Sequence, residues 1–253
     1  MTINFLGTSA GWPLPRLGCI CPICTSKDQK DKRTRSAILV DEQILIDSGP
    51  DIYHQLINNN PEKIHSVLIT HGHPDHILGL HDLGHIYNRK TDLKIFTPQP
   101  VINQIKRKFD YNLAPLKFIP VREEEVFEIG LYHCFFFPVE HVKQATYGVK
   151  IKKNKFFGYI PDFSKLPKRS EYYIKDAHLL VLDGSSFSKI GQSKSHINIE
   201  QGIKLAKKLK AKQVFFTHIG HKTGRHSELE KILQIKAGKN YQMAFDGLII
   251  ELD

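Results

Sequence analysis

Four side chains that commonly bind metal ions occur within six residues of this chain, in the stretch THGHPDH, directly after the hydrophobic run SVLIT. In an extended loop, His71 and His73 point to the same side, so their imidazole nitrogens can bind one metal ion. Pro74 then turns the chain, and Asp75 and His76 can face a second ion nearby. Because imidazole with carboxylate suits zinc, iron or manganese, the spacing predicts a metal centre.

One loop cannot complete the coordination of two ions, and three further side chains stand just past hydrophobic strands. His141 follows CFFFPVE, Asp162 follows KFFGYIP, and His218 follows QVFFT. Connections beyond strand ends are where functional sites are usually built. Asp162 is the natural bridge between two ions, because a carboxylate can bind two cations at once.

A second group of candidate ligands lies near the N-terminus, where CICPIC contains Cys19, Cys21 and Cys24. No signal peptide is recognisable before them, so we expect a cytoplasmic protein whose thiols stay reduced. Under those conditions a cysteine cluster is more typical of metal binding than of disulfide bonds. A closed structural zinc site has four ligands, so a fourth side chain is needed.

Two residues compete for the role of that fourth ligand. Cys134 lies in the aromatic run LYHCFFF, which is typical of a strand in the core. His221 comes three residues after His218, so one histidine of THIGH can serve the active site while the other reaches the cysteines. We therefore expect His221 as the ligand. An exchange of His218 and His221, or His226 in that role, are the alternatives.

The elements that must position these residues are short strands with helices between some of them. Strand-like segments, β-branched or aromatic and bounded by turn residues, are residues 3–7, 37–40, 44–47, 66–70, 94–97, 117–121, 125–129, 131–139, 146–151, 155–160, 179–183, 213–217 and 247–252. Helical patterns lie at residues 51–59, 100–109, 197–210 and 227–235. This mixture predicts a sandwich of β-sheets covered by helices. The sequence has no GxGxxG motif and no P-loop motif, so nucleotide-binding folds lack support.

The composition fits a soluble globular protein with a core large enough to fold without disulfides. The chain has 253 residues, of which 41% are hydrophobic and 25% charged, and its formal net charge is +10. Such a field attracts anions, although a general richness in lysine is the preferred explanation, because the lysines are scattered along the chain. No apolar run is long enough to span a bilayer, so no membrane contact is expected. No linker or repeat divides the chain.

The stretch THGHPDH resembles the HxHxDH signature of the metallo-β-lactamase superfamily, and His141, Asp162 and His218 fall in the order of its remaining ligand motifs. The resemblance covers essentially the whole chain. It implies an α/β (α+β) fold, an αβ/βα sandwich of two mixed β-sheets flanked by helices, with residues 1–253 as a single domain. It also implies two divalent ions in the active site, either Zn²⁺ or Mn²⁺, with iron as a further choice.

The same resemblance distributes the ligands between the two ions. One ion is held by His71, His73 and His141, the other by Asp75, His76 and His218, and Asp162 bridges them. Asp47, in ILIDSG, matches the structural aspartate on the preceding strand. The flavodiiron branch usually has Glu where this chain has His73, which favours hydrolysis over oxygen chemistry.

The opening LGTSAGWPLPRLGCICPIC is similar to that of the phosphoribosyl 1,2-cyclic phosphate phosphodiesterases and their relatives, as are RTRSAILV, SHINIEQGI and THIGH. This resemblance implies that His196 acts on the scissile phosphate. The alternative is that His196 is simply a residue at the start of a helix, with no catalytic role. The resemblance also implies one structural zinc, bound by Cys19, Cys21, Cys24 and His221. Transfer-RNA processing nucleases share HxHxDH, but they need an RNA-gripping insertion that no segment here resembles.

We therefore predict a dinuclear metal-dependent hydrolase, a phosphodiesterase for a small cyclic phosphate or nucleotide-like diester. A hydroxide shared by the two ions is the expected nucleophile, and Asp75, Asp162 and His196 are the expected catalytic residues. The alternatives are hydrolysis of a lactone, thioester or other ester, and a metal-binding role like that of the pyrroloquinoline-quinone-associated protein. A small anionic phosphodiester is the expected partner, together with a second copy in a homodimer. Nucleic-acid binding has only the net charge in its favour. Four residues are pocket candidates for which a surface or supporting role is preferred: His81, His85, Lys222 and Arg225.

Overall fold

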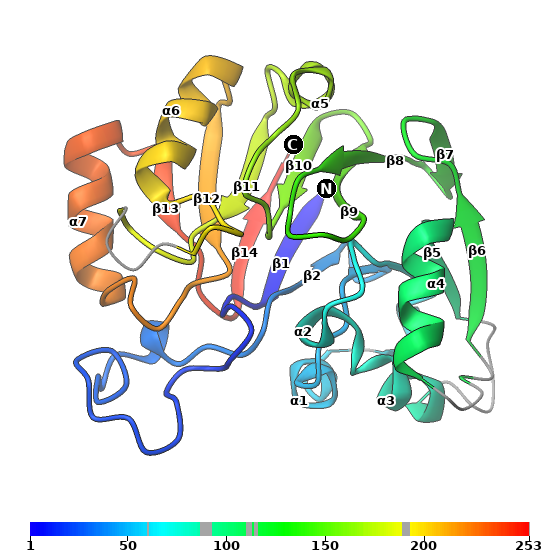
Figure 1. The fold of residues 1–253 in the computed structure, drawn as a ribbon, viewed down its shortest axis with the longest axis horizontal. Helices are drawn as coiled ribbons and strands as arrows, with labels where there is room; N and C mark the ends of the chain where they lie inside the picture. The colour runs from blue at the N-terminus through cyan, green and yellow to red at the C-terminus, as the bar shows by residue number, and fades with distance from the viewer. Residues whose placement is uncertain (60, 87–92, 110–112, 114–115, 189–192, 253) are drawn as a thin grey trace.

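The computed structural model contains two seven-stranded β-sheets that face each other, with helices covering their outer sides (Figure 1). It describes all residues except 60, 87–92, 110–112, 114–115, 189–192 and 253. The first sheet has the strand order β14 (Leu248–Glu251), β1 (Thr2–Gly7), β2 (Ala37–Val40), β3 (Ile44–Ile46), β4 (Ser66–Leu68), β5 (Lys94–Pro98) and β6 (Lys117–Val121). The second has the order β13 (Tyr241–Met243), β12 (Gln213–Thr217), β11 (Leu179–Asp183), β10 (Phe156–Ile160), β9 (Thr146–Lys152), β8 (Tyr132–Val139) and β7 (Val126–Ile129).

Both sheets are mixed, as expected from the sequence, and they repeat one topology. In the first, β1 to β3 pair antiparallel and β3 to β6 pair parallel. In the second, β7 to β10 pair antiparallel and β10 to β13 pair parallel. The last strand, β14, pairs antiparallel with β1, which places the two ends of the chain side by side (Figure 1). Each sheet therefore presents the carboxyl ends of several parallel strands, where open α/β sheets usually bind ligands.

The helices connect the strands and cover the sheets. They are α1 (Ile52–Leu56), α2 (Pro74–Ile77), α3 (Leu80–Ile86), α4 (Gln99–Lys108), α5 (Lys168–Ile174), α6 (Ile199–Leu209) and α7 (His226–Ala237), with short 3₁₀ turns at Gln29–Asp31 and Pro61–Lys63. The expected strands and the four expected helices are all present, whereas α2, α3, α5 and β13 were not predicted. No helix among the described residues has the length and apolar character needed to cross a membrane.

The aromatic run of β8 shows how strand alternation separates the two sides of the second sheet. Phe136 joins the core cluster shared by both sheets, whereas Phe135 and Phe137 join the cluster beneath α5, α6 and α7. This alternation follows from the two-residue period of a strand. Opposite Phe137 stands Gly148, where an added Cβ would clash with the phenylalanine ring. The glycine thus makes room for the ring in the densely packed layer.

Helix α6 is specified by its own sequence. Asn198 and Gln201 form a reciprocal capping box at its start, and Lys210 ends it in the left-handed conformation. The buried residues Ile203 and Ala206 lie on the face that packs against the second sheet. The candidate site residue His196 lies two residues before this cap, so the start of α6 helps to position it.

Candidate metal centre

Loops that follow strands of both sheets bring the candidate ligands together. The first sheet supplies the stretch His71–His76 after β4, and the second sheet supplies single residues after β8, β10 and β12: His141, Asp162 and His218. Pro74 stands at the first position of α2, where its missing N–H costs nothing, and His73 caps the helix in an extended conformation. The turn expected at Pro74 is therefore present and separates the first pair of ligands from the second.

The first ligand set is a cluster of three imidazole nitrogens. The Nε2 atom of His71 lies 3.0 Å from Nδ1 of His73, which lies 3.3 Å from Nε2 of His141. Nitrogen atoms around a tetrahedral zinc, each about 2.0–2.1 Å from the ion, are separated by about 3.3 Å. The three nitrogens thus have the spacing of ligands to one ion, and Asp162 completes the group.

The second ligand set consists of Asp75, His76 and His218. The Oδ2 atom of Asp75 lies 3.4 Å from Nε2 of His76 and 3.5 Å from Nε2 of His218. Both Nε2 atoms are buried without a hydrogen-bond partner among the described residues. Buried polar atoms are normally satisfied, so a bound cation fits these two orphaned nitrogens.

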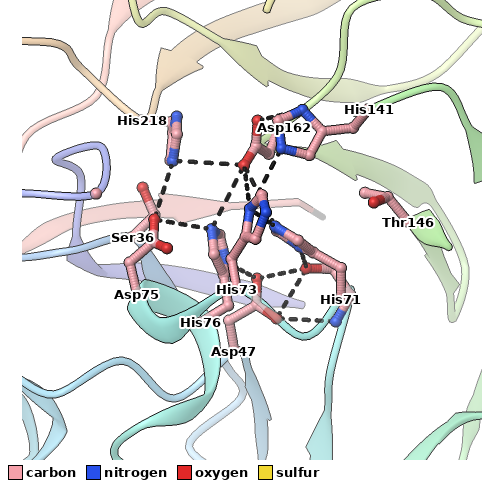
Figure 2. Close-up of polar contacts among 12 residues, drawn as sticks. Ser36, Asp47, His71, His73, Asp75, His76, His141, Thr146, Asp162 and His218 are labelled. Carbon is pink, nitrogen blue, oxygen red and sulfur yellow. Dashed lines mark hydrogen bonds and ion pairs between the residues drawn. The ribbon is translucent and has the colours of Figure 1, made fainter. Parts of the chain in front are cut away.

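Asp162 lies between the two sets, as Figure 2 shows. Its Oδ2 atom is 3.3 Å from Nε2 of His71 in the first set. The same oxygen is 4.0 Å from Nε2 of His76 and 3.9 Å from Nε2 of His218 in the second set. One carboxylate oxygen therefore faces both sets, which is the arrangement expected for a bridging residue.

The electrostatics of the site favour a cation. Burial lowers the pKa of His71 to about 4, so this ring is neutral and its lone pair is available at neutral pH. Burial opposes the charge on His76, but Asp75 and Asp47 outweigh it and raise the pKa of His76 well above its usual value. The space around His76 thus attracts a positive charge, which is a proton when no metal ion is bound.

Asp47 supports the second set without belonging to it. This fully buried residue follows β3, and its Oδ2 atom accepts a hydrogen bond from Nδ1 of His76 at 2.8 Å. Its Oδ1 atom accepts from the backbone N–H of Thr70 at 2.9 Å. The carboxylate thus keeps the proton of His76 on Nδ1 and leaves Nε2 to bind a metal. Asp47 and His218 both adopt left-handed backbone angles, with φ of 64° and 56°, a strain that persists where a site requires it.

His196 lies beside both ligand sets. Its ring centroid is 5.2 Å from that of His141 and 5.4 Å from that of His218. Its Nδ1 atom lies 2.8 Å from Oδ2 of Asp183 and 2.9 Å from Oδ1 of Asp162. Burial opposes the imidazolium, but these two carboxylates outweigh it and raise the pKa of His196 to about 10. Asp183 was not predicted as a site residue, although it lies at the end of β11, and a position at a strand end is the signal that indicated Asp162 and His218.

The cysteine cluster forms a separate group near His221. The Sγ atoms of Cys19 and Cys21 lie 3.0 and 3.1 Å from Nε2 of His221, and Cys24 belongs to the same group. All four cysteines of the chain are free thiols. Burial raises the pKa of Cys134 to about 12, and this residue lies in the core, away from the cluster. The three thiols and one imidazole are the donor set of a closed structural zinc site.

The remaining candidates lie elsewhere. Nδ1 of His226, the alternative zinc ligand, accepts a hydrogen bond from Nη2 of the buried Arg33 at 3.1 Å, and His226 does not belong to the group formed by the cysteines and His221. His81 and His85 are exposed on α3 and contact each other. Arg225 donates to the carbonyl of Pro22, so it lies against the cysteine loop. None of these side chains joins a candidate ligand group among the described residues.

Comparison with known proteins agrees with this architecture. A family model described as the beta-lactamase superfamily domain matches residues 42–219. An octanoyltransferase from Porphyromonas gingivalis is 29% identical over 98% of this chain and 50% of its own length. Ribonuclease BN from Escherichia coli is 29% identical over 61% of this chain and 50% of its own length. The chain thus spans about half the length of these curated relatives.

Two solved structures resemble the whole chain. A diphosphatase of the PhnP family superposes with a TM-score of 0.88 at 28% identity, covering 100% of this chain and 98% of that protein. The zinc-bound PqqB protein of Methylobacterium extorquens superposes with a TM-score of 0.82 at 22% identity, covering 100% of both chains. The second likeness shows the fold alone.

Proposed function

The chain belongs to the metallo-β-lactamase superfamily, and from this premise we propose that it is a metal-dependent phosphodiesterase. The observation that carries the proposal is the position of Asp162, which faces two ligand sets, each built from both sheets. Two-metal sites of this kind serve phosphatases and nucleases. The similarity to a PhnP-family diphosphatase and to Ribonuclease BN supports hydrolysis at phosphorus, and the ribonuclease supports a phosphodiester as the substrate.

The distances between the candidate ligands support the following roles. One ion would be held by His71, His73 and His141, a second by Asp75, His76 and His218, with Asp162 shared between them. Zinc and manganese both suit imidazole with carboxylate, and iron remains a further choice. When bound, two such ions supply Lewis acidity, which lowers the pKa of a water and neutralises charge on phosphoryl oxygens. The cluster of Cys19, Cys21, Cys24 and His221 would hold a structural zinc.

His196 is the residue that would donate a proton to the leaving oxygen. Its raised pKa keeps the ring protonated at neutral pH, and the carboxylates of Asp183 and Asp162 hold its Nδ1 side. The proton on Nε2 is then the one that can be given to a leaving alkoxide. Asp183 is a positioning residue, because it acts on the substrate only through His196.

Hydrolysis of bis(p-nitrophenyl) phosphate by protein loaded with zinc or manganese tests the proposal. Asp162→Asn is expected to lower kcat/KM by at least about 100-fold, because losing the shared carboxylate would weaken the hold on the ions that stabilise charge in the transition state. Asp176→Asn is the matched control, because Asp176 is exposed and its positive φ suits asparagine. Full activity of Asp162→Asn, or equal turnover by metal-free protein, would contradict the proposal.

A thioester hydrolase is the second candidate. It is favoured by the octanoyltransferase from Porphyromonas gingivalis, half of whose length corresponds to nearly the whole of this chain. Release of free thiol from octanoyl-coenzyme A, measured beside diester hydrolysis, separates the two candidates. If metal-loaded protein hydrolysed neither substrate, the result would favour a metal-binding role without catalysis.

Size-exclusion chromatography with light scattering tests the expected homodimer, and cell fractionation tests the expected cytoplasmic location.

A further inference from the structure

A cleft of about 350 Å³ lies at the end of the second sheet that is opposite to the candidate metal centre. The metal centre uses residues at or just past the carboxyl ends of β10, β11 and β12, whereas the cleft is lined mainly by residues at the amino ends of these strands. Strand β11 is five residues long, so His178 before it and Asp183 at its end lie about 17 Å apart, at about 3.3 Å per residue. The cleft is therefore a separate site, and its volume is in the range that binds small molecules.

Parallel strand pairing brings the lining residues together. Strands β10 to β13 run parallel, so the residues that directly precede them lie close together along one edge of the sheet. All four of these residues line the cleft: Lys155, His178, Lys212 and Asn240. The backbone N–H of Lys212 donates to the carbonyl of Ala177 at 2.8 Å, and that of His178 donates to the carbonyl of Phe156 at 3.2 Å. The sheet itself therefore sets the spacing of the side chains.

The cleft has a surplus of positive charge. It is lined by three lysines, Lys155, Lys212 and Lys239, whose ammonium groups make no ion pair or hydrogen bond with any described residue. Burial lowers the pKa of His178, and Lys212 and Lys155 lower it further, so this ring is neutral at neutral pH. Glu251 is the only carboxylate among the described residues of the lining, which leaves two positive charges uncompensated. A cleft lined by charge of one sign concentrates ions of the opposite sign.

The chemistry of the lining suits a phosphate monoester. Such a group carries about 1.5–2 negative charges at pH 7, which matches the surplus of the lining. Its oxygens accept hydrogen bonds from ammonium groups, each of which offers three donors. The side-chain amides of Gln213 and Asn240 line the same cleft and offer polar contacts to the rest of a ligand.

We propose that this cleft binds a small molecule with a phosphate monoester group, and that Lys155 and Lys212 hold the phosphate. These two lysines are the ones close enough to His178 to act on it, so they bracket one point of the cleft. The phosphate fills only part of the cleft, and the remaining volume takes an uncharged polar group such as a sugar. The inference goes beyond the proposed reaction and does not depend on it, because the cleft shares no residue with the metal centre.

Calorimetry of the metal-loaded protein with glucose 6-phosphate tests the inference, with glucose and inorganic phosphate as comparison ligands. Lys155→Gln and Lys212→Gln are each expected to weaken the binding of glucose 6-phosphate about ten-fold, the loss expected for one hydrogen bond to a charged group. Lys231→Gln is the matched control, because Lys231 is exposed on α7, does not line the cleft, and its replacement changes the net charge equally. All three variants are expected to melt at the wild-type temperature, because the lysines that they replace make no ion pair with any described residue.

The comparison ligands separate a phosphate monoester from the free ion. Glucose is expected not to bind, and inorganic phosphate is expected to bind more weakly than glucose 6-phosphate; equal binding by inorganic phosphate would show that the site takes the free ion and would overturn the assignment. Binding of glucose 6-phosphate at the metal centre is common to all variants and cancels in the comparison.

Three results would overturn the inference: no binding of glucose 6-phosphate by the wild type, unchanged binding by Lys155→Gln and Lys212→Gln, or an equal loss in Lys231→Gln. The last would assign the binding to the general positive field of the protein. Hydrolysis of bis(p-nitrophenyl) phosphate is measured in parallel, and the cleft variants should keep the wild-type kcat and KM. If the wild type hydrolyses no diester, the proposed function fails, and calorimetry still decides whether the cleft binds the phosphate monoester.

Discussion

Replacing Asp47 by asparagine tests whether a residue that touches no ion controls the second ligand set. Asparagine keeps the shape of the side chain and tolerates the left-handed φ of 64° at this position. It also removes the negative charge that fixes the proton of His76 on Nδ1. We expect Asp47→Asn to weaken the ion held by Asp75, His76 and His218 more than the other ion.

The magnitude follows from the hydrogen bonds. Oδ1 of Asp47 accepts from the N–H of Thr70 at 2.9 Å, and Oδ2 accepts from Nδ1 of His76 at 2.8 Å. In either orientation of an asparagine amide, its NH₂ group faces one of these two donors. Because the NH₂ group is itself a donor, one of the two hydrogen bonds is lost. Losing a buried hydrogen bond to a charged group costs about 1.5–3 kcal/mol, which matches the roughly 10–100-fold loss of metal affinity seen when supporting residues are changed.

A competition titration against a chromogenic chelator measures the affinity of each ion. The expected result is one ion weakened by about 10–100-fold and one little changed. Asp41→Asn is the control, because Asp41 is a partly buried carboxylate that bonds Tyr132 rather than any candidate ligand. Folded Asp47→Asn protein that bound both ions as tightly as the wild type would refute the reasoning.

Further predictions concern the cysteine cluster, a buried histidine and the support of His196. Cys21→Ser should lose one zinc per chain and melt at a lower temperature yet keep its active-site ions, and unchanged zinc content in metal analysis would exclude this role. Burial and Arg33 lower the pKa of His226 to about 4 from 6.5, so its neutral ring stabilises the protein above pH 6.5, and that stabilisation is lost as the pH falls toward 4. Denaturant titrations should therefore show the free energy of unfolding of His226→Asn falling by about 2 kcal/mol less than that of the wild type over this interval, a figure reduced for solvent screening, and equal losses would contradict it. Asp183→Asn should lower kcat with little change in KM and move the basic limb of the pH profile to lower pH, because it removes a carboxylate that raises the pKa of the proton donor His196; an unmoved basic limb would contradict this role.

The strands could be predicted because each is a short run of β-branched or aromatic residues between turn residues. The missed elements lack such a signal. Helix α5 buries only Ser170 and Ile174, so its sequence shows no apolar stripe. Helix α2 has four residues, and two of them, Asp75 and His76, are candidate ligands rather than residues chosen for helix packing.

The candidate ligands could be predicted because THGHPDH gathers four metal-binding side chains within six residues, which gave weight to the single histidines and aspartate just past later strands. Their grouping into two sets came from resemblance, and the structure brings the members of each set together. Asp183 was not predicted because an aspartate at the end of a strand is common and does not indicate a functional site unless the residue it contacts is known. That partner, His196, is thirteen residues away and lies across the site only after folding. The lysine-lined cleft at the opposite end of the second sheet likewise depends on contacts between distant segments.

Each ligand set contains residues from both sheets. An ion bound at either set would therefore connect the two sheets, and metal binding would be coupled to folding. At a free metal concentration of 100 times the dissociation constant, one ion adds about 2.7 kcal/mol to the stability of the folded state. Metal starvation would then reduce the amount of folded protein as well as its turnover, because unfolded chains are removed by proteases.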